Sequence, residues 1–433
     1  MARQGMETPK IYIETHGCKL NEADTQNLSK QLIEAGYRLT VTPERANVHI
    51  VNTCTVTHVA DKKARQAIRK AKRINKQSLL VVTGCYVERS PEAVSQLEGI
   101  DLLIGNRMKH SIVEDISTLL NFVSPKAQVS PSPDEESIAA NALRPMIKIQ
   151  EGCNQVCSYC IVPKVRGTER SVDPNTLIKM VNKASQEGHM EVVLTGTQLG
   201  SYGFDLVDAS LNTLLSRVLK ETTIPRLRVS SLQPQEINDE LIQLWDNKRL
   251  CPHFHLPLQS GSSTVLSRMR RRYSVEHYRQ AVEKIRARLP SATITTDVIV
   301  GFPGESEKQF TETYNLCKEI KFANLHLFPY SSRPGTSAYY LSNKVGTKDI
   351  RARMNLMLNL AKLQASDYKK SILGTTSKVL WETHKKIGNA TTWSGLTDNY
   401  IRVTTTSDKP LRNVITPVEL EKFTNGVVWA RIL

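Results

Sequence analysis

The stretch "EGCNQVCSYCIVPKVR", residues 151–166, carries three cysteines spaced four and then three positions apart. They are Cys153, Cys157 and Cys160, and they follow an apolar run at 146–150 that is typical of a strand. A closed structural zinc site takes four ligands, and an odd number of thiols cannot all pair as disulfides. A metal is therefore favoured over a disulfide. It is either zinc with a fourth ligand from elsewhere or a cubane iron–sulfur cluster with one iron left open.

The composition indicates a reduced protein with a polyanionic partner. The chain has 433 residues, enough for two to three domains, and its eight cysteines are far fewer than a disulfide-stapled secreted domain uses. It has no apolar signal segment and no apolar run near the ~20 residues of a membrane span, so we expect a cytoplasmic protein without a membrane partner. The formal net charge of +16 favours nucleic acid, with a solvated basic surface as the alternative. No heptad pattern appears, so we expect a monomer.

Residues 1–123 are predicted to form a doubly wound parallel α/β domain, because short apolar runs alternate with helical patterns. Strands of such a sheet bind ligands at their carboxyl ends. Cys18, Cys54 and Cys85 each lie at or just beyond such an end. A glycine directly precedes Cys18 and Cys85, which we expect to open the backbone to close approach by a ligand.

The remainder of the chain divides at changes of pattern. Residues 124–142 are rich in Ser, Pro and acidic side chains and are predicted to be a linker. Residues 143–368 hold six strand-and-helix units, which favour a partial (β/α)6 barrel with its site at the carboxyl ends of the strands. Residues 369–433 alternate with period two and predict a small all-β barrel. Cys251 and Cys317 are predicted to lie in the core.

Several motifs together resemble one family. The C-x3-C-x2-C spacing after the first barrel strand resembles the signature of the radical S-adenosylmethionine (SAM) enzymes. The segments "ETHGCKLNEADTQ" (14–26), "NTCTVTHVADKKARQ" (52–66) and "VVTGC" (81–85) resemble the N-terminal domain of the methylthiotransferases. The tail resembles the TRAM module, a small RNA-binding barrel. The resemblance covers nearly the whole chain and implies a radical SAM methylthiotransferase.

The resemblance implies two [4Fe-4S] clusters and SAM as cofactors. The ligands of the SAM-binding cluster would be Cys153, Cys157 and Cys160, and those of an auxiliary cluster Cys18, Cys54 and Cys85. One electron, from a donor such as flavodoxin or ferredoxin, would cleave SAM to methionine and a 5′-deoxyadenosyl radical. The radical would abstract hydrogen from the substrate, and a methylated sulfur from the auxiliary cluster would be delivered to that carbon. No side chain is assigned a catalytic role, because the radical forms at the cluster-bound SAM.

Loops that follow the later barrel strands are predicted to contact SAM. The residues concerned are Thr195, Gly196, Gln198, Gln259, Ser260 and Gly301. The first three occupy the place where other radical SAM enzymes carry a Gly-Gly-Glu turn, from which this sequence departs, and Gly301 is expected to let the backbone approach the adenine. Ordinary turn formation is the alternative for the glycines. Arg166 is expected to steer a SAM carboxylate or an RNA phosphate, with a plain surface arginine as the alternative.

The family that the chain resembles divides by substrate. Its members modify an isopentenyl-type adenosine in tRNA, a threonylcarbamoyl-type adenosine at the same position, or an aspartate of a ribosomal protein. The segments "LGSYG" (199–203), "RVSSLQP" (228–234) and "LFPYSSRPGTSA" (327–338) resemble the threonylcarbamoyladenosine branch. We therefore expect a methylthio group to be added to C2 of N6-threonylcarbamoyladenosine at position 37, on a base unstacked from the tRNA anticodon loop. The other two substrates, and a non-catalytic zinc-dependent RNA-binding protein, are the alternatives.

Basic side chains indicate where tRNA would bind. The helical segment "DKKARQAIRKAKRINK" (61–76) has one basic face opposite a narrow stripe formed by Ala60, Ala64, Ala67, Ala71 and Ile74. A second basic cluster lies in "SRMRRRY" (267–273), and Trp393 is an aromatic candidate in the tail, where ordinary core aromatics are the alternative. The residues expected to contact RNA are Lys62, Lys63, Arg69, Lys70, Arg73, Arg270, Arg271, Tyr400 and Arg402.

Overall fold

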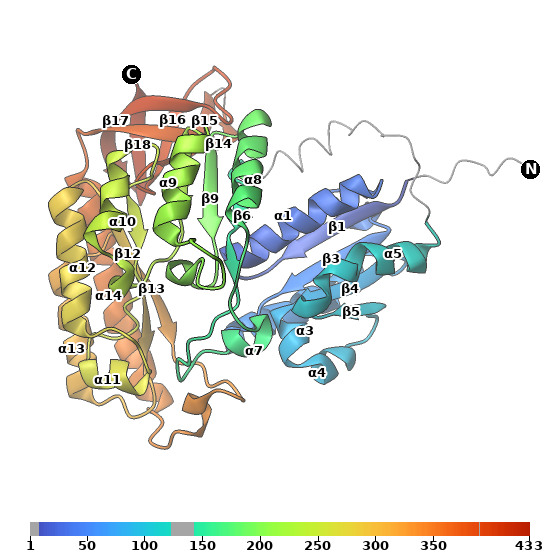
Figure 1. The fold of residues 1–433 in the computed structure, drawn as a ribbon, viewed down its shortest axis with the longest axis horizontal. Coiled ribbons are helices and arrows are strands. Elements are labelled where there is room, and N and C mark those ends of the chain that lie inside the picture. Colours follow the sequence, from blue (N-terminus) through green and yellow to red (C-terminus); the bar gives the residue numbers. More distant parts are fainter. Residues whose placement is uncertain (1–7, 123–142, 389) are drawn as a thin grey trace, which may run out of the picture. The chain divides into compact units, whose positions relative to one another are not determined.

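The computed structural model describes residues 8–122, 143–388 and 390–433 (Figure 1). They belong to two compact units, Met1–Gln155 with Cys160–Glu169 and Val156–Tyr159 with Arg170–Leu433. The linker predicted at 124–142 lies outside the described residues. Within the described residues, no helix is both long enough and apolar enough to cross a membrane.

Parallel strands form the sheet of the first unit, in the order β2-β1-β3-β4-β5. The strands are β1 (Lys10–Thr15), β2 (Arg38–Leu39), β3 (Val48–Thr53), β4 (Leu79–Gly84) and β5 (Leu102–Ile104). This is one of the two common doubly wound orders, and it confirms the predicted fold class for this part of the chain. The order reverses between β1 and β3, and sheets of this kind bind ligands outside the carboxyl ends of the strands at such a point.

Helices cover both faces of this sheet because its strands are apolar on both sides. The helices are α1 (Lys19–Glu34), α2 (His58–Ile74), α3 (Cys85–Arg89), α4 (Pro91–Ser95) and α5 (Ile112–Leu120), with 3-10 turns η1 (Pro43–Arg45) and η2 (Asn106–Ser111). Helices α1 and α5 pack with Ile50 in one core, and α2 to α4 pack with Val51 in the other. The buried stripe of α2 includes Ile68, which the predicted stripe omitted, whereas Ala60 and Ile74 are only partly buried.

The barrel strands are parallel wherever their pairing lies within the second unit. They are β9 (Glu191–Thr195), β10 (Arg226–Val229), β11 (His253–His255), β12 (Thr293–Val300) and β13 (Asn324–Pro329). The two-residue strand β8 (Arg170–Ser171) lies outside the sheets that these strands form. Strand β10 pairs with β9, and β12 pairs with β11 and β13. Single bridges join the β10 region to the β11 region. The first predicted barrel strand appears in the first unit as β6 (Met146–Lys148) and β7 (Gln150–Glu151).

Helices follow the barrel strands as predicted (Figure 1). They are α7 (Val162–Arg166) in the first unit and, in the second, α8 (Pro174–Gln186), α9 (Leu211–Glu221), α10 (Asp239–Gln243), α11 (Ser263–Arg268), α12 (Val275–Arg288), α13 (Glu307–Ile320) and α14 (Thr347–Ser371). Short 3-10 turns are η3 (Leu199–Ser201), η4 (Pro234–Glu236), η5 (Leu244–Asp246) and η6 (Ser337–Tyr340). Cys251 and Cys317 are buried, as predicted.

The tail forms the predicted small barrel. Its strands are β14 (Thr376–Ile387), β15 (Ala390–Thr397), β16 (Arg402–Thr406), β17 (Ile415–Thr424) and β18 (Val427–Ile432), closed in the order β14-β15-β16-β18-β17. Neighbouring strands are antiparallel except β16 and β18. Trp381 and Trp393 lie in its core, so the expectation that Trp393 contacts RNA is wrong.

Buried charges fasten the small barrel to β9 and β10. Glu191 forms ion pairs with Arg226 and Arg228, each at 2.8 Å. Both arginines also donate to the backbone oxygen of Thr397, and Arg228 donates to that of Asp398. Every one of these charges is paired, and a buried charge left without its partner typically costs about 3–5 kcal/mol. The connection is therefore a specific contact rather than a loose tether.

Candidate functional site

Three cysteines gather where β1, β3 and β4 end. Cys54 directly follows β3, Cys85 directly follows β4, and Cys18 is the residue before α1. Strand β3 pairs with both β1 and β4, and neighbouring strands lie about 4.8 Å apart. Both Cys85 and Cys18 act electrostatically on the Cys54 thiol. Positions far apart in the sequence thus meet at the carboxyl edge of the sheet, around the point where the strand order reverses.

Gly17 and Gly84 allow the strand ends to approach one another. Gly17 has φ +121°, and a Cβ there would lie 2.8 Å from the Cβ of Cys54. Gly84 has φ +103°, and a Cβ there would lie 2.4 Å from the backbone oxygen of Thr53. The expectation that these glycines leave room for a ligand is wrong, because protein atoms fill the space. They are needed so that the backbone can bring the cysteines together.

Cys54 and Cys85 are buried, and their surroundings affect their protonation and orientation. Burial raises the pKa of the Cys54 thiol to about 12, and the neighbouring Cys85 and Cys18 contribute to this increase. A thiol in this state keeps its proton at neutral pH unless a metal displaces it. The Asn106 side chain donates to Cys85 Sγ at 3.3 Å and to the backbone oxygen of Val165 at 2.7 Å. Such an outer hydrogen bond orients a ligand and tunes the bound metal.

Charged side chains buried in the same unit surround Asp24. Its carboxylate pairs with Lys109 and Lys148 at 2.8 Å and with Arg166 at 2.9 Å. Arg166 also pairs with Glu151 at 2.7 Å. Three cations against two carboxylates leave the cluster with a net positive charge.

The surroundings of Arg166 contradict the expectation that it contacts SAM or RNA. It is only 5% exposed and already pairs with two carboxylates, so it is neither a surface arginine nor a free donor for SAM or a phosphate. Its side chain also donates to Asn21. Burial opposes the charge of Arg166, but Cys85, Asp24 and Glu151 outweigh burial and raise its pKa above the ordinary value.

The buried charges fit an anionic thiolate site. Burial raises the pKa of Asp24, but Lys109, Arg166 and Lys148 together hold that pKa well below its usual range. A thiolate at Cys85 or Cys18 would favour the charged form of Arg166 and raise its pKa. Three thiols with an amide donor and buried cations nearby form a donor set suited to an iron–sulfur cluster.

Cys153, Cys157 and Cys160 lie on the loop between β7 and α7, and all three are partly exposed. In the first unit, the N–H of Cys153 donates to the backbone oxygen of Gly167 at 3.1 Å. In the second unit, Ser158 donates through its N–H to the Met269 oxygen and through its hydroxyl to the Arg268 oxygen. These bonds hold the backbone of the loop on either side of Cys157.

Arg271 joins Cys157 to a polar network at the ends of β9 and β10. Its guanidinium donates to Cys157 Sγ at 3.3 Å and to Gln233 Oε1 at 3.1 Å. The Gln233 side chain donates to Gln198, which donates to Glu236. The expectation that Arg271 contacts RNA is therefore corrected: it faces a cysteine. Gln233 and Glu236 were missed, although "QPQE" (233–236) follows the third strand as the predicted SAM loops follow theirs.

Two of the predicted SAM residues face protein instead. The Ser260 hydroxyl is buried and lies 3.1 Å from that of Thr313. A Cβ on Gly301 would lie 2.5 Å from Ile350, and the Gly301 N–H donates to Glu305 at 2.9 Å. Both expectations are wrong. The Ser260 hydroxyl already has a protein partner, and protein atoms fill the space beside Gly301.

The other predicted SAM residues lie at strand ends, as expected. Thr195 is the last residue of β9, Gly196 follows it, and Gln198 belongs to the network with Gln233. Gln259 pairs through its backbone with the β12 region and is partly buried.

The residues predicted to contact RNA have different surroundings. Those on α2 are all exposed: Lys62, Lys63, Arg69, Lys70 and Arg73. Arg270 is exposed, and Arg402 is exposed with an ion pair to Glu382 at 2.9 Å. Tyr400 stacks on His253 at 4.3 Å, with Arg228 4.9 Å from its ring centre. That ring packs the small barrel against β10 and β11, which corrects its assignment to RNA.

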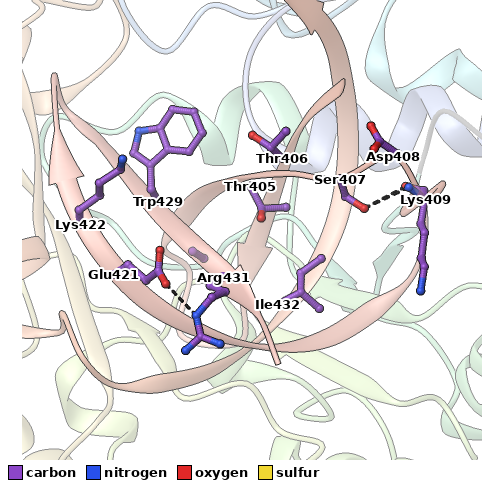
Figure 2. Close-up of a pocket in the computed structure, with 11 residues that line it drawn as sticks. Thr405, Thr406, Ser407, Asp408, Lys409, Glu421, Lys422, Trp429, Arg431 and Ile432 are labelled. Carbon is purple, nitrogen blue, oxygen red and sulfur yellow. Dashed lines mark hydrogen bonds and ion pairs between the residues drawn. The ribbon is translucent and has the colours of Figure 1, made fainter. Parts of the chain in front are cut away.

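The small barrel also carries a pocket of about 670 Å³ (Figure 2). Lys409, Lys422 and Trp429 are among its lining residues, and the Lys422 ammonium lies 5.6 Å from the Trp429 ring centre. Figure 2 also shows the ion pair between Glu421 and Arg431. Aromatic rings beside basic groups are typical of single-stranded nucleic-acid sites. The sequence carried a signal for this pocket in "GVVWARIL" (426–433), which was interpreted only as a strand.

Comparisons with known proteins agree with this geometry. The family model described as "Uncharacterized protein family UPF0004" matches residues 10–105, and the Radical SAM superfamily model matches residues 147–317. The threonylcarbamoyladenosine tRNA methylthiotransferase MtaB of Bacillus subtilis is 37% identical over 95% of this chain and 94% of its own. The MtaB of Aquifex aeolicus is 37% identical over 91% and 96%. The tRNA-2-methylthio-N(6)-dimethylallyladenosine synthase of Dictyoglomus thermophilum is 33% identical over 98% and 97%.

A solved structure shares the fold. The radical S-adenosylmethionine methyltransferase TsrM from Kitasatospora setae, with cobalamin and a [4Fe-4S] cluster bound, aligns with a TM-score of 0.55. The alignment covers 77% of each chain at 15% identity, so it bears on the fold alone.

Proposed function

We propose that this chain, which belongs to the family of radical SAM tRNA methylthiotransferases, adds a methylthio group to C2 of N6-threonylcarbamoyladenosine at position 37 of tRNA. The observation that carries the proposal is the meeting of Cys18, Cys54 and Cys85 at the carboxyl edge of the first sheet, in a chain that has a second set of three on one loop. A transferase that moves sulfur needs a site that holds the sulfur apart from the site that starts the radical. Two sets of three thiols meet that requirement.

Two [4Fe-4S] clusters and SAM are the cofactors of this family. Cys153, Cys157 and Cys160 would hold the cluster that binds SAM. Cys18, Cys54 and Cys85 would hold the auxiliary cluster. When bound, these groups supply a reductively formed 5′-deoxyadenosyl radical and the sulfur to be transferred.

The side chains of the protein position and balance these groups. Asn106 donates to Cys85, and the buried cations around Asp24 offset the charge of thiolates in the first unit. Arg271 donates to Cys157 and keeps Gln233 in place. Thr195, Gly196, Gln198 and Gln259 stay the proposed SAM contacts, since they lie at or after the carboxyl ends of barrel strands, where such sites are built.

Transfer RNA would be held by basic surfaces. The exposed face of α2 offers Lys62, Lys63, Arg69, Lys70 and Arg73, and Arg270 and Arg402 are exposed elsewhere. The pocket beside Trp429 would take an unstacked base or a backbone segment of single-stranded RNA.

The substrate branch rests on similarity. Relatives named for threonylcarbamoyladenosine reach 37% identity, and those named for dimethylallyladenosine reach 33%. The loop motifs at 199–203, 228–234 and 327–338 favour the same branch.

The organisation of the protein in the cell is part of the proposal. We propose three domains, at 1–123, 143–368 and 369–433 with a linker at 124–142, acting as a monomer in the cytoplasm away from membranes. A flavodoxin or ferredoxin would supply the electron.

The test is mass spectrometry of tRNA nucleosides. Reconstituted enzyme, SAM, sulfide and reductant are incubated with tRNA that carries threonylcarbamoyladenosine or isopentenyladenosine but no methylthio group. We expect a methylthio mass shift on threonylcarbamoyladenosine alone. Cys54→Ala should abolish it, whereas Cys317→Ala, a matched change at a buried cysteine outside both sets, should keep it.

Two outcomes would contradict the proposal. A shift only on isopentenyladenosine would move the chain to the other substrate branch. Full product from Cys54→Ala would show that the cysteines of the first sheet do not deliver the sulfur.

A further inference from the structure

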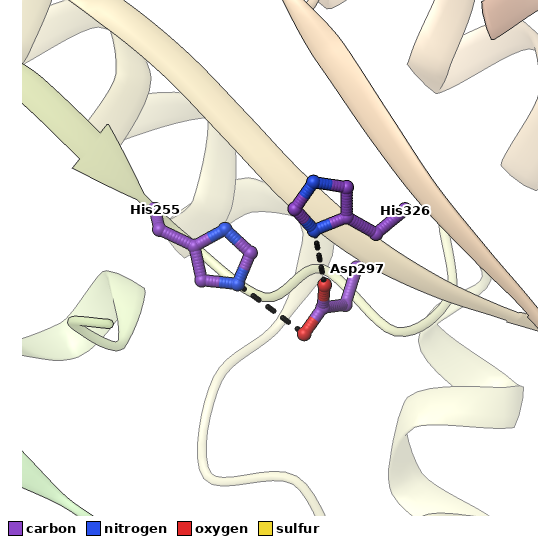
Figure 3. A group of neighbouring side chains, drawn as sticks. All are labelled: His255, Asp297 and His326. Carbon is purple, nitrogen blue, oxygen red and sulfur yellow. Dashed lines mark hydrogen bonds and ion pairs between the residues drawn. The ribbon is translucent and has the colours of Figure 1, made fainter. Parts of the chain in front are cut away.

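A cluster of His255, Asp297 and His326 lies on three neighbouring strands of the second unit and has no role in the proposed function (Figure 3). His255 ends β11, Asp297 lies in β12 and His326 in β13. The strands are in register so that Asp297 is directly opposite His326, and Thr295, two residues before Asp297, is opposite His255. Because side chains alternate between the faces of a sheet, all of these residues project from the same face.

Two distances within the cluster match those between ligands of one ion. Asp297 Oδ2 lies 3.2 Å from His255 Nε2, and Asp297 Oδ1 lies 3.2 Å from His326 Nδ1. Ligand nitrogen and oxygen atoms bind zinc at about 2.0–2.2 Å, which places neighbouring ligands about 3.0–3.5 Å apart. Potential ligand atoms of the three residues all lie within 4.8 Å of one another. A small ion could therefore bind all three with only local adjustment of the side chains.

His255 is also oriented in the way that metal-ligating histidines usually are. Its Nδ1 lies 3.1 Å from the Thr295 hydroxyl, on the side of the ring away from Asp297. That hydroxyl is held in turn by His253 Nε2 at 3.0 Å. A partner on the second ring nitrogen fixes the ring and leaves Nε2 directed at the shared site.

An ion could reach the site from solvent. The His326 side chain is 45% exposed and that of Asp297 28%, whereas His255 is 12% exposed. The carboxylate carries one negative charge and neutral imidazoles carry none, so a divalent cation would be favoured electrostatically. Two imidazoles and one carboxylate are the ligands of several catalytic zinc sites and of non-haem iron sites with open positions.

We infer that His255, Asp297 and His326 bind one divalent first-row transition-metal ion. The exposed side of His326 leaves at least one coordination position to water or to an oxygen or nitrogen donor of a bound molecule. None of the three residues is among the six cysteines, and the inference does not depend on the proposed reaction. Without a metal, the same three residues would form only a pair of hydrogen bonds from two imidazoles to one carboxylate.

The experiment measures zinc uptake by the untagged holoprotein. Both iron–sulfur clusters are reconstituted first, so that the cysteines are occupied, and iron is quantified in every sample. The protein is then dialysed against zinc chloride, and bound zinc is counted by mass spectrometry of the elements. We expect about one zinc per chain, with at least a tenfold loss of affinity in Asp297→Asn and His326→Ala. His110→Ala, at an exposed histidine of the first unit, is the matched control and should bind zinc as the unmodified chain does.

The remaining results would overturn the inference. Absence of stoichiometric zinc in the unmodified protein would leave the cluster as a hydrogen-bonded group. Equal zinc uptake by the unmodified chain and both variants would place the metal elsewhere. His326→Ala removes a half-exposed side chain and is expected to fold, and unchanged iron content and circular dichroism would verify this even if Asp297→Asn failed to fold.

Discussion

The two sets of cysteines are held in opposite ways. Cys18, Cys54 and Cys85 come from three strand ends, and two of them are buried. Cys153, Cys157 and Cys160 lie on one loop and are all partly exposed. The first set depends on the sheet, on two glycines with positive φ and on a buried charge cluster. In the second set, the covalent chain itself keeps the thiols close.

This difference predicts how each set fails. Cys18, Cys54 and Cys85 form the scattered set. A change in the first sheet, even one far in sequence from these cysteines, should disturb this set, because the fold of the sheet brings its thiols together. The loop set, Cys153, Cys157 and Cys160, should tolerate such changes and respond to its own neighbours, among which Arg271 donates to Cys157.

The largest expected effect comes from removing a ligand. Cys54→Ala and Cys153→Ala should each remove one cluster, so that iron and acid-labile sulfide fall to about half in each and both lose product formation. Electron paramagnetic resonance of the reduced variants should show that a different cluster remains in each. Loss of both clusters from either variant would contradict the independence of the two sets.

Asp24→Asn tests the charge cluster behind the scattered set. Removing this carboxylate leaves Lys109 and Arg166 short of a buried partner, and we expect a loss of about 3–5 kcal/mol in the free energy of unfolding by urea. Glu22→Gln, an exposed change two residues earlier on α1, should cost under about 1 kcal/mol. Equal losses in both variants would mean that the cluster contributes nothing specific.

The same carboxylate predicts a pH dependence. The folded-state pKa of Asp24 lies below its unfolded value of about 3.9, so its stabilising effect is complete above that pH. It is lost as the pH falls toward the folded-state pKa. The unmodified protein should therefore lose more stability than Asp24→Asn between about pH 5 and pH 2, as measured by urea unfolding across this range.

Gly84→Ala should disturb the scattered set through the backbone. The new methyl group would meet the Thr53 backbone at 2.4 Å at a φ of +103°, and we expect about 1–3 kcal/mol of destabilisation with reduced iron content. Gly167→Ala is the control, since it has φ +76° but nothing within 4 Å of the added carbon. It should cost about 1–2 kcal/mol, with the first-sheet cluster retained. Identical iron contents in the two variants would contradict the role given to Gly84.

Arg271→Gln should have the smallest effect and should act on the loop set alone. Losing a charged N–H donor to Cys157 Sγ should make the reduction potential of that cluster more negative, as measured by potentiometric titration. Arg270→Gln, at the exposed neighbouring arginine, should leave the potential unchanged. A shift of the same size in Arg270→Gln would indicate a general effect of net charge.

Most of the fold could be predicted from the chain alone. Hydrophobic runs and turn residues located the principal strands and the small barrel, because periodicity reports which side of an element is buried. The pattern missed β2, with two residues, and α3, which begins at Cys85 itself. Such short elements form because their neighbours hold them, and they leave little trace in local periodicity.

The functional side chains were harder to predict because the direction of a side chain is a tertiary property. Arg166, Arg271 and Tyr400 were assigned to ligands or RNA from their type and position. In the fold they meet Asp24, Cys157 and His253 respectively. A basic or aromatic residue looks the same in sequence whether its partner is a phosphate, a carboxylate or another ring.

The sequence by itself determined the order of the principal elements, the set formed by Cys153, Cys157 and Cys160 and the basic face of α2, since each follows from a pattern along one chain. It also placed Cys18, Cys54 and Cys85 at strand ends, and the family resemblance joined them into one set. Only the tertiary structure decided that Arg166 is buried against two carboxylates and that the Thr53 backbone fills the space beside Gly84. It also decided that His255, Asp297 and His326 project from one face of the same sheet. The physical reason is that these contacts depend on strand register and on packing between residues far apart in sequence. No local pattern specifies either of them.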